Sequence, residues 1–474
     1  MDFMSSPLYN EVEEIQKKGN TNPYHIWSVY FKIKDTYTGP LVDEDSKVEH
    51  DPEEKDRIFK PMKLMSLDRE EDYINGFGDS VKVEVMVPMG MWAKILYPAR
   101  DHVSVVVVRK NGAKALAANS GEFESEEVTF DAAFEITPGL MTESASLNVR
   151  DRDDLDTGYP PVRPTINLLN PSLEKIRRIY SGTIARNAKP ADVVKAVFAN
   201  ALKNIPAESE DDKLTFTMVD PDNTEKRDHI VIPPSIPLMD LPIYIQKKAG
   251  GIYNTGMGCY MKGNDIHVFS TNNIKRYDEE EEGLILIVVP KDRFPGVPTT
   301  YKTEGGRTTV MVTAPGSFTD FSKTAQLAAG NGIRLADART IMNGYAETKD
   351  NKAIVSRKEN NHEYVFNDLQ GQNNVIIPEE ALTSNIFEVR SKQSKLLGGV
   401  ANFLWENCDT SLIKPAMPVK VLYLTKDGVQ ELRGIVQGVQ QYVATEGTGI
   451  VVESYRNSAA LFVFISAYDE EAIQ

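Results

Sequence analysis

The stretch Val81-Lys82-Val83-Glu84-Val85-Met86-Val87 alternates between apolar and charged side chains over most of its length. Successive side chains of a β-strand point to opposite faces, so this pattern predicts a strand with one buried and one solvated face. Similar patterns lie on both sides of it. The further predicted strands of this region are Trp27–Ile33, Trp92–Tyr97, Val103–Arg109, Val128–Ile136 and Thr165–Leu169.

Helical spacing appears mainly in the middle of the chain. Pro190 suits a first helical position, and apolar residues from Val193 to Leu202 recur at helical intervals. A second helix is predicted over Leu238–Ala249, with Pro242 in its first turn and Gly250-Gly251 ending it. Shorter helices are predicted around two further segments, Ala336–Met342 and Leu396–Trp405.

The remaining apolar segments again predict strands. Val419–Leu424 and Val429–Val436 flank Asp427-Gly428, a dipeptide that strongly favours a β-hairpin turn. Asp220-Pro221-Asp222-Asn223 similarly predicts a hairpin turn between Leu214–Met218 and His229–Ile232. Other predicted strands are Tyr260–Phe269, Leu284–Val289, Thr308–Val312, Ile450–Tyr455 and Leu461–Ile465. The predicted fold class is α+β, predominantly antiparallel β, with a small C-terminal β element.

Composition narrows the class of protein. The 474 residues include 53 Lys and Arg against 69 Asp and Glu, a formal net charge of −16, which argues against wrapping nucleic acid by neutralising phosphates. Two cysteines, Cys259 and Cys408, are too few for a disulfide scaffold. No apolar run reaches the ~18 residues that span a membrane, and the N-terminus lacks the pattern of a signal peptide. We therefore expect a soluble protein made in the cytosol.

Motifs for chemistry are missing from the sequence. Gly76-Phe77-Gly78 and Gly256-Met257-Gly258 do not continue into a phosphate-binding loop. The six histidines stand apart, and no GxSxG is present. Asp151–Asp156 has Leu155 at a ligand position, which favours an acidic surface turn over a calcium loop. Asp278–Glu282 is predicted to be a solvated loop rather than a cation site. No catalytic, cofactor-binding or metal-binding residue is predicted, and the chain is not expected to be an enzyme.

Four groups of short segments, taken in their order along the chain, resemble the pattern of a known protein family. The first group is Ser66–Tyr73, Gly78–Val83, Pro88–Trp92 and Ile95–Asp101. The second is Ile232–Pro237, Ile252–Gly256 and Ile266–Ser270, and the third is Gly330–Arg334 with Asp337, then Ser384–Phe387. The fourth is Leu412–Val419 with Arg433–Val436. In this order they resemble the central hub protein of contractile phage-tail baseplates, which is also seen in related long-tailed phages.

One position departs from the pattern of that family. Its members usually have Pro-Gly-Met where this chain has Pro415-Ala416-Met417. Alanine does not easily adopt a positive φ. Either the turn differs locally in this chain, or the correspondence of the two sequences is imperfect here.

The resemblance implies a virion structural protein of the tail baseplate, made in the bacterial host cytoplasm. Hub proteins are similar to a doubled tail-tube subunit, so the expected units are an N-terminal arm (1–24), a first tube-like β-barrel (25–165), a central α+β region (166–245), a second tube-like barrel (246–395) and a C-terminal helix plus β element (396–474). A homotrimer would adapt the sixfold tail tube to the threefold central spike.

The resemblance also implies partners. These are the tail tube or a tube-adaptor protein, the central spike protein and baseplate wedge proteins, while viral DNA passes through the channel without specific binding. The residues that bind these partners are not predicted. The alternatives are another tail component, namely a wedge, tube-cap or receptor-binding protein, or, less favoured, a cell-wall-degrading tail enzyme.

Overall fold

The structure is a computed structural model, and most of the β-rich regions are described in it. The described residues are 3–19, 25–37, 57–111, 125–135, 161–205, 213–295, 299–320, 346–349, 352–359, 362–367, 398–445 and 455–466, with Asn385, Phe387, Arg390, Ser391, Ser394 and Lys395. The Asp151–Asp156 run and the predicted helix Ala336–Met342 lie outside these residues. No helix among them is both long and apolar enough to span a bilayer.

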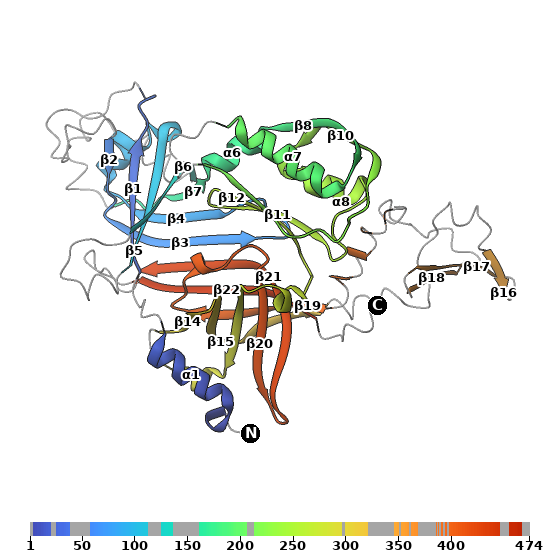
Figure 1. The fold of residues 1–474 in the computed structure, drawn as a ribbon. Helices are drawn as coiled ribbons and strands as arrows, with labels where there is room; N and C mark the ends of the chain where they lie inside the picture. Colours follow the sequence, from blue (N-terminus) through green and yellow to red (C-terminus); the bar gives the residue numbers. More distant parts are fainter. Residues whose placement is uncertain are drawn as a thin grey trace.

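The first β-unit is a curled antiparallel sheet with strand order β2-β1-β5-β6-β7-β4-β3 (Figure 1). Its strands are β1 His25–Ile33, β2 Arg57–Phe59, β3 Lys63–Asp72, β4 Ser80–Met86, β5 Val103–Asn111, β6 Ser125–Glu135 and β7 Thr165–Leu169. Alternate residues bury inward, so that Val81, Val83 and Val85 of β4 join one hydrophobic core. The alternation seen in the sequence is therefore the inward face of this sheet.

The prediction of a strand over Trp92–Tyr97 is wrong. The chain forms α2 (Met89–Met91), a π-helical turn (Trp92–Leu96) and a 3-10 turn (Arg100–His102). Trp92, Ile95 and Leu96 are all buried in the core of the first sheet. Their i, i+3, i+4 spacing is helical. The π-helical turn packs these three side chains against the inner face of the curled sheet and fills its core.

The second β-unit is a closed six-stranded barrel, in which β21, β20, β13, β15, β19 and β22 pair in a ring and β22 returns to β21. Its strands are β13 Gly283–Val289, β15 Arg307–Asp320, β19 Gly398–Glu406, β20 Pro418–Thr425, β21 Gly428–Thr445 and β22 Tyr455–Ser466, and β14 (Tyr301–Glu304) adds to β15. Only β13 is parallel to its neighbours, β15 and β20. The barrel draws strands from both of the predicted ranges 246–395 and 396–474.

Two predictions for the barrel have opposite outcomes. The hairpin at Asp427-Gly428 is confirmed, since β20 and β21 pair up to Thr425 and Gly428. The predicted helix over Leu396–Trp405 is wrong, because this segment is mostly the strand β19. Phe403 and Trp405 point into the barrel core while Leu404 between them is exposed, an alternation of period two that a helix would not produce.

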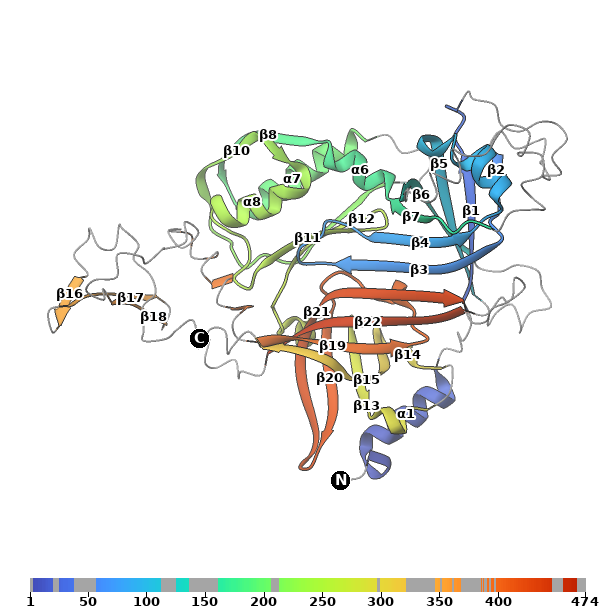
Figure 2. The same cartoon turned by 180° about the vertical axis from the view of Figure 1, so that it is seen from behind.

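The central α+β unit lies above the barrel and beside the first sheet (Figures 1 and 2). Its elements are α6 Pro171–Arg177, β8 Tyr180–Ala188, α7 Pro190–Lys203, β9 Thr215–Met218, β10 Arg227–Pro237, a 3-10 turn Leu238–Asp240, α8 Leu241–Lys248, β11 Met257–Lys262 and β12 Asp265–Ser270. Both predicted helices are confirmed, with Pro190 and Pro242 in their first turns. The predicted strand Tyr260–Phe269 is a hairpin of β11 and β12.

The hairpin predicted at Asp220-Pro221-Asp222-Asn223 is wrong. The strands on its two sides belong to different sheets, because β9 pairs with β12 and β10 pairs with β8. Asn223 is buried instead, and its side chain donates to the carbonyl oxygens of Gly250 and Gly251. The turn residues therefore hold the end of α8 rather than connect two paired strands.

The remaining elements lie outside these three units. Helix α1 (Pro7–Lys18), preceded by a 3-10 turn (Phe3–Ser5), packs on the barrel and shares a hydrophobic cluster with β13 and β15. Short helices are α9 (Arg276–Glu279) and the 3-10 turns Lys291–Arg293 and Thr410–Leu412. A separate antiparallel sheet contains β16 Ala346–Lys349, β17 Lys352–Glu359 and β18 His362–Asn367. The predicted fold class, α+β with predominantly antiparallel strands, is confirmed.

The Ala416 backbone has a φ of 53°, in the left-handed region that glycine adopts more readily than alanine. Its carbonyl oxygen accepts a hydrogen bond of 2.8 Å from Arg276. Replacing Ala416 by glycine relieves about 1–2 kcal/mol of backbone strain. It also loses a buried methyl group (~0.8 kcal/mol) and adds unfolded-state entropy (~0.5–1 kcal/mol), so we expect the unfolding free energy to stay within about 0.5 kcal/mol.

Ala401 offers a matched control in the same core cluster, because both alanines are almost fully buried. Ala401 lies in β19 with ordinary strand geometry, so Ala401→Gly relieves no strain. We expect it to lower the unfolding free energy by about 1.5 kcal/mol. Equal losses for the two variants in urea denaturation would contradict the left-handed conformation of Ala416.

Candidate functional site at the junction of the three units

Four charged side chains meet where the first sheet, the central unit and the barrel come together, a region called the junction below. Arg69 and Glu71 project from β3, Asp79 precedes β4, and Lys262 ends β11. Arg69 forms ion pairs with Asp79 and with Glu71, the latter at 3.0 Å from Nε to Oε1. Lys262 Nζ lies 2.9 Å from the other Glu71 oxygen. Glu71 is only 1% exposed, so its charge is held by these two cations.

Two tyrosines bind the two carboxylates of the junction through their hydroxyl groups. Tyr73 donates a hydrogen bond to Glu71, and the Tyr260 hydroxyl donates to Asp79 at 2.7 Å. Their rings meet edge to face with centroids 4.8 Å apart. Burial raises the pKa of both phenols well above the ordinary value, and the neighbouring carboxylates raise it further. The carboxylates of Asp79 and Glu71 also raise the pKa of Arg69, more than offsetting its burial.

The loop between β19 and β20 brings the barrel into the junction. Lys262 Nζ donates to the carbonyl oxygens of Thr410 and Ile413, at 3.0 and 2.8 Å. Thr410 then donates to Gln441 of β21, whose amide donates to Asn457 of β22. One lysine of the central unit is therefore bonded both to the first sheet, through Glu71, and to the barrel, through the loop.

A second ion pair joins the first sheet to the barrel directly. Arg109 of β5 lies 2.8 Å from Asp409, and the two side chains are 17% and 12% exposed. Asp409 Oδ1 also accepts from the amide and hydroxyl of Ser411, which fixes the start of the 3-10 turn Thr410–Leu412. Partly buried pairs of this kind hold their partners at a defined distance and angle.

Neither of the two described thiols is suited to covalent chemistry. Burial raises the pKa of the Cys408 thiol beside the junction, and burial does the same to Cys259 in the central unit. A thiol with a raised pKa is a poor nucleophile. Across the described residues, no group of three or more His, Cys, Asp or Glu side chains is arranged to hold a metal ion. What the arrangement does is fix three β-rich units relative to one another.

The acidic run Asp278–Glu282 is more ordered than a solvated loop. It begins inside α9, and Arg276 pairs with Glu280 at 2.6 Å. Arg433 pairs with Asp278 at 2.9 Å, and both Arg307 and Arg433 lie over the ring of Tyr277. Asp278 remains 64% exposed, so the part of the prediction that placed these carboxylates at the surface agrees with the structure.

The structure brings several of the quoted segments together. The junction includes residues from Ser66–Tyr73, Gly78–Val83 and Leu412–Val419. The first two segments supply Arg69, Glu71, Tyr73 and Asp79, and the third supplies the carbonyl oxygen of Ile413. Of the third group, Asn385 donates to the carbonyl oxygen of Gln246 at the end of α8. Gly330–Arg334 lies outside the described residues.

Sequence reasoning missed Lys262, Arg109 and Asp409 as parts of one site. Their partners lie 191 and 300 positions away along the chain, and no local spacing signals such pairs. The local signal was the run of four charged side chains followed by an aromatic one in Arg69-Glu70-Glu71-Asp72-Tyr73.

Comparisons with known proteins give folds of low similarity. No protein-family model and no curated protein matches the sequence. Among solved structures, a Neisseria meningitidis tail protein has a TM-score of 0.40 at 10% identity, covering 94% of this chain and 97% of its own. The 43 kDa tail protein of prophage MuSo2 from Shewanella oneidensis has a TM-score of 0.42 at 8% identity, with coverages of 94% and 100%.

A third similar structure is an Escherichia coli component of the type VI secretion system, described as structurally similar to the phage T4 tail proteins gp27 and gp5. Its TM-score is 0.39 at 8% identity, covering 86% of this chain and 74% of its own. Structural similarity as low as this does not identify the function of the chain.

Lys262→Met tests the junction. The variant leaves the buried Glu71 carboxylate with one cation instead of two. It also removes the lysine hydrogen bonds to the carbonyl oxygens of Thr410 and Ile413, of which the Thr410 oxygen keeps the Ile413 amide as a donor. Breaking a buried pair from one side costs about 3–5 kcal/mol, so we expect the unfolding free energy to fall by about 3 kcal/mol. The control is Lys17→Met, which removes an exposed i,i+4 pair with Glu13 and should change stability by at most about 0.5 kcal/mol. Similar effects in urea denaturation would show that the junction is not a buried ionic site.

Alkaline pH gives a second test. Tyr73 and Tyr260 stay protonated in the folded protein above the ordinary tyrosine pKa near 10, whereas the unfolded chain loses these protons. Stability is therefore fully present below pH 10 and falls as pH rises above it, by up to about 1.4 kcal/mol per pH unit for each such tyrosine. Tyr260→Phe should make the decline shallower above pH 10, measured by urea denaturation at pH 9 to 11. An unchanged slope would contradict the burial of this phenol.

Proposed function

We propose that the protein is a virion structural protein of a phage tail, a trimeric baseplate hub that adapts the sixfold tail tube to the threefold central spike. The observation that carries the proposal is the edge-to-edge pairing of β3 with β21, which fuses two β-units of one chain into a single sheet. Three such chains would present six β-units around one axis, the number that a sixfold tube requires.

The rigid link between the units supports this role. A symmetry adaptor needs its two β-units at a fixed angle, because each must occupy a set place in the ring. The β3–β21 pairing and the ion pair of Arg109 with Asp409 join these units directly. In this proposal the tube-like units are residues 25–165 and residues 246–395, the latter completed by strands of 396–474.

Exposed apolar side chains on the barrel wall supply contact surface for neighbouring copies. Phe318, Leu404 and Tyr442 are 56%, 37% and 48% exposed. They belong to β15, β19 and β21, and Phe403 and Trp405 on either side of Leu404 face the barrel core. Large apolar side chains on the outer face of a barrel are typical of surfaces that pack against other proteins.

The proposed partners are the tail tube or a tube-adaptor protein above the ring, the central spike below it and wedge proteins around it, all within the virion. The net charge of −16 supports a channel that repels DNA phosphates, so that DNA passes without specific binding. The alternative of a cell-wall-degrading enzyme has no support in the junction, whose carboxylates are bound by cations and tyrosines.

Native mass spectrometry with negative-stain imaging tests the hub proposal. We expect a trimer of three 52.9 kDa chains, seen as a ring with six lobes and a central hole. Because an acidic side chain on the barrel wall would disrupt apolar packing, Phe318→Glu and Tyr442→Glu should lower the trimer fraction. Met4→Glu, at an exposed position of the N-terminal turn, is the matched control. A hexamer or an elongated rod would contradict the hub and favour a tube, wedge or fibre protein.

A further inference from the structure

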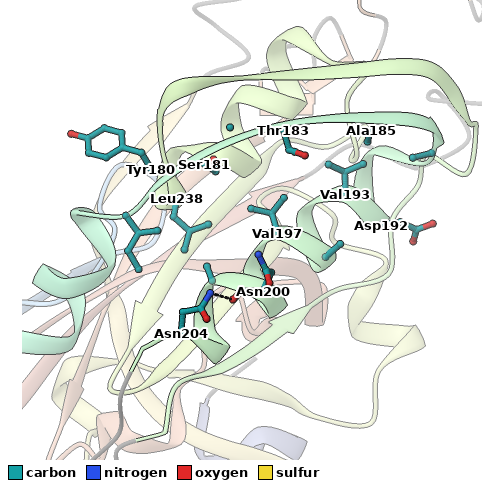
Figure 3. A pocket seen from close by; sticks show the side chains of 15 residues that line it. Tyr180, Ser181, Thr183, Ala185, Asp192, Val193, Val197, Asn200, Asn204 and Leu238 are labelled. Carbon is teal, nitrogen blue, oxygen red and sulfur yellow. Dashed lines mark hydrogen bonds between the residues drawn. The ribbon is translucent and has the colours of Figure 1, made fainter.

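A groove opens in the central unit between strand β8 and helix α7 (Figure 3). Its volume is about 660 Å³. Val193 and Val197 of α7 and Leu238 are among the apolar side chains of its lining, and Asn200 and Asn204 lie towards one end (Figure 3). The groove has no part in the junction described above.

The groove is where a third strand would be expected. Among the described residues, β8 pairs only with β10, so this sheet has two strands and the other edge of β8 carries unpaired backbone groups. Ser181, Thr183 and Ala185 of β8 line the groove together with α7. A strand added to the free edge would extend the sheet on the side of β8 away from β10, where its inward side chains could be buried as Ile230 and Ile232 of β10 are.

The side chains around the groove leave room for those of such a strand. Ala196 and Asn200 of α7 are exposed although they lie in the groove lining, whereas Val194 and Phe198 on the opposite face are fully buried. On the outer face of the sheet, Ile184 stands directly opposite Val231, and the two are 64% and 53% exposed. An added strand would lengthen this apolar outer face and fill the lining with inward side chains.

The charge around the groove specifies the partner. Residues 166–205 contain seven basic and two acidic side chains, a net charge of +5 in a chain whose net charge is −16. Arg186 of β8 and Lys195 and Lys203 of α7 are exposed. One acid, Asp192, lines the groove itself. A strand that carries acidic side chains would be complementary to this surface.

Two other occupants fit less well. Pairing of β8 with β8 of a second copy about a twofold axis would place two copies of the same basic surface, with a net charge of +5 over residues 166–205, side by side. Nucleic acid would match the charge, but Tyr180 is the single aromatic side chain among the lining residues, and Val193, Val197 and Leu238 give further bases nothing to stack on.

We propose that the free edge of β8 binds an extended segment of another protein as a third strand, with apolar side chains directed into the groove and acidic side chains at its surface. Main-chain hydrogen bonds to β8 would provide affinity, and the groove with its basic rim would provide specificity. The inference rests on the central unit and is independent of whether the chain forms a trimer.

The probe is a fluorescein-labelled ten-residue peptide with valine at alternate positions and glutamate between them, and its twin carries lysine in place of glutamate. Fluorescence anisotropy with the full chain should show binding of the glutamate peptide that weakens as salt is raised. The lysine peptide should not bind at the same concentrations. Hydrogen exchange should show new protection in Tyr180–Ala188 on binding, because the edge amides become paired.

Two substitutions on one helix separate groove binding from loss of folding. Ala196 and Ala199 are both exposed on α7, but only Ala196 lines the groove. Ala196→Trp fills the groove and should weaken peptide binding at least tenfold, whereas Ala199→Trp should leave it within twofold. Arg186→Glu should weaken binding several-fold, and Lys248→Glu on α8 should leave it unchanged.

Several outcomes would overturn the proposal. These are equal binding of the two peptides, equal binding by the two tryptophan variants, or binding without new protection in Tyr180–Ala188. Direct binding of a labelled single-stranded oligonucleotide that is lost in Ala196→Trp and kept in Ala199→Trp would assign the groove to nucleic acid. A change of oligomeric state in Ala196→Trp, without any peptide binding by the unchanged protein, would assign it to a second copy of the chain.

Discussion

The pairing of β3 with β21 is the constraint on which the rest of the structure depends. Seven residue pairs, from Asp72 with Gly438 to Ser66 with Ala444, make the first sheet and the barrel neighbours in one hydrogen-bonded surface. A Cβ atom at Gly438 would lie 2.8 Å from the carbonyl oxygen of Glu71, so only glycine allows this close approach. Because β21 also closes the barrel against β22, its register sets both units at once.

The buried charges hold the three units in place in addition to this strand pairing. An ionic cluster adds little net stability compared with a well-packed apolar core, but it strongly disfavours arrangements in which any one partner is missing. Glu71 is paired with Arg69 and Lys262 and accepts a hydrogen bond from Tyr73. Three separate β-rich units are thereby held in one mutual arrangement, since sliding any of them would leave a buried charge without its counter-ion.

The sequence predicted those elements whose signals are local. The alternation at Val81–Val87, the helix beginning at Pro190 and the hairpin at Asp427-Gly428 each depend on neighbouring residues, and the structure confirms them. Trp92–Tyr97 was misassigned because aromatic and branched residues favour strands, although their spacing there is helical. The helix predicted over Leu396–Trp405 is a strand instead. Its two glycines, Gly398 and Gly399, leave room for the rings of Phe464 and Phe318 to pack against the strand, and this contact is not visible in the local sequence.

The junction could not be predicted because its charges come from distant segments. The order of the quoted segments indicated that Ser66–Tyr73 and Leu412–Val419 matter, but not that Lys262 would join them. Pairing of strands from distant segments is a property of topology, and the sequence carries no short-range record of it. The same holds for β13, which is parallel to both of its neighbours in a fold that was predicted to be predominantly antiparallel, because nothing in its local sequence marks the direction of its partners.

The topology of the barrel also dictates when the chain can fold. The edge of β3 stays open until β21, hundreds of residues later, has been synthesised, and the ring cannot close before β22 follows it. Such long-range contacts make folding slow, and an open edge during synthesis can pair with the wrong strand. Folding of this protein is therefore completed only after almost the whole described chain has left the ribosome. The first sheet reaches its native pairing only when β21 and β22, the last described strands, have been synthesised.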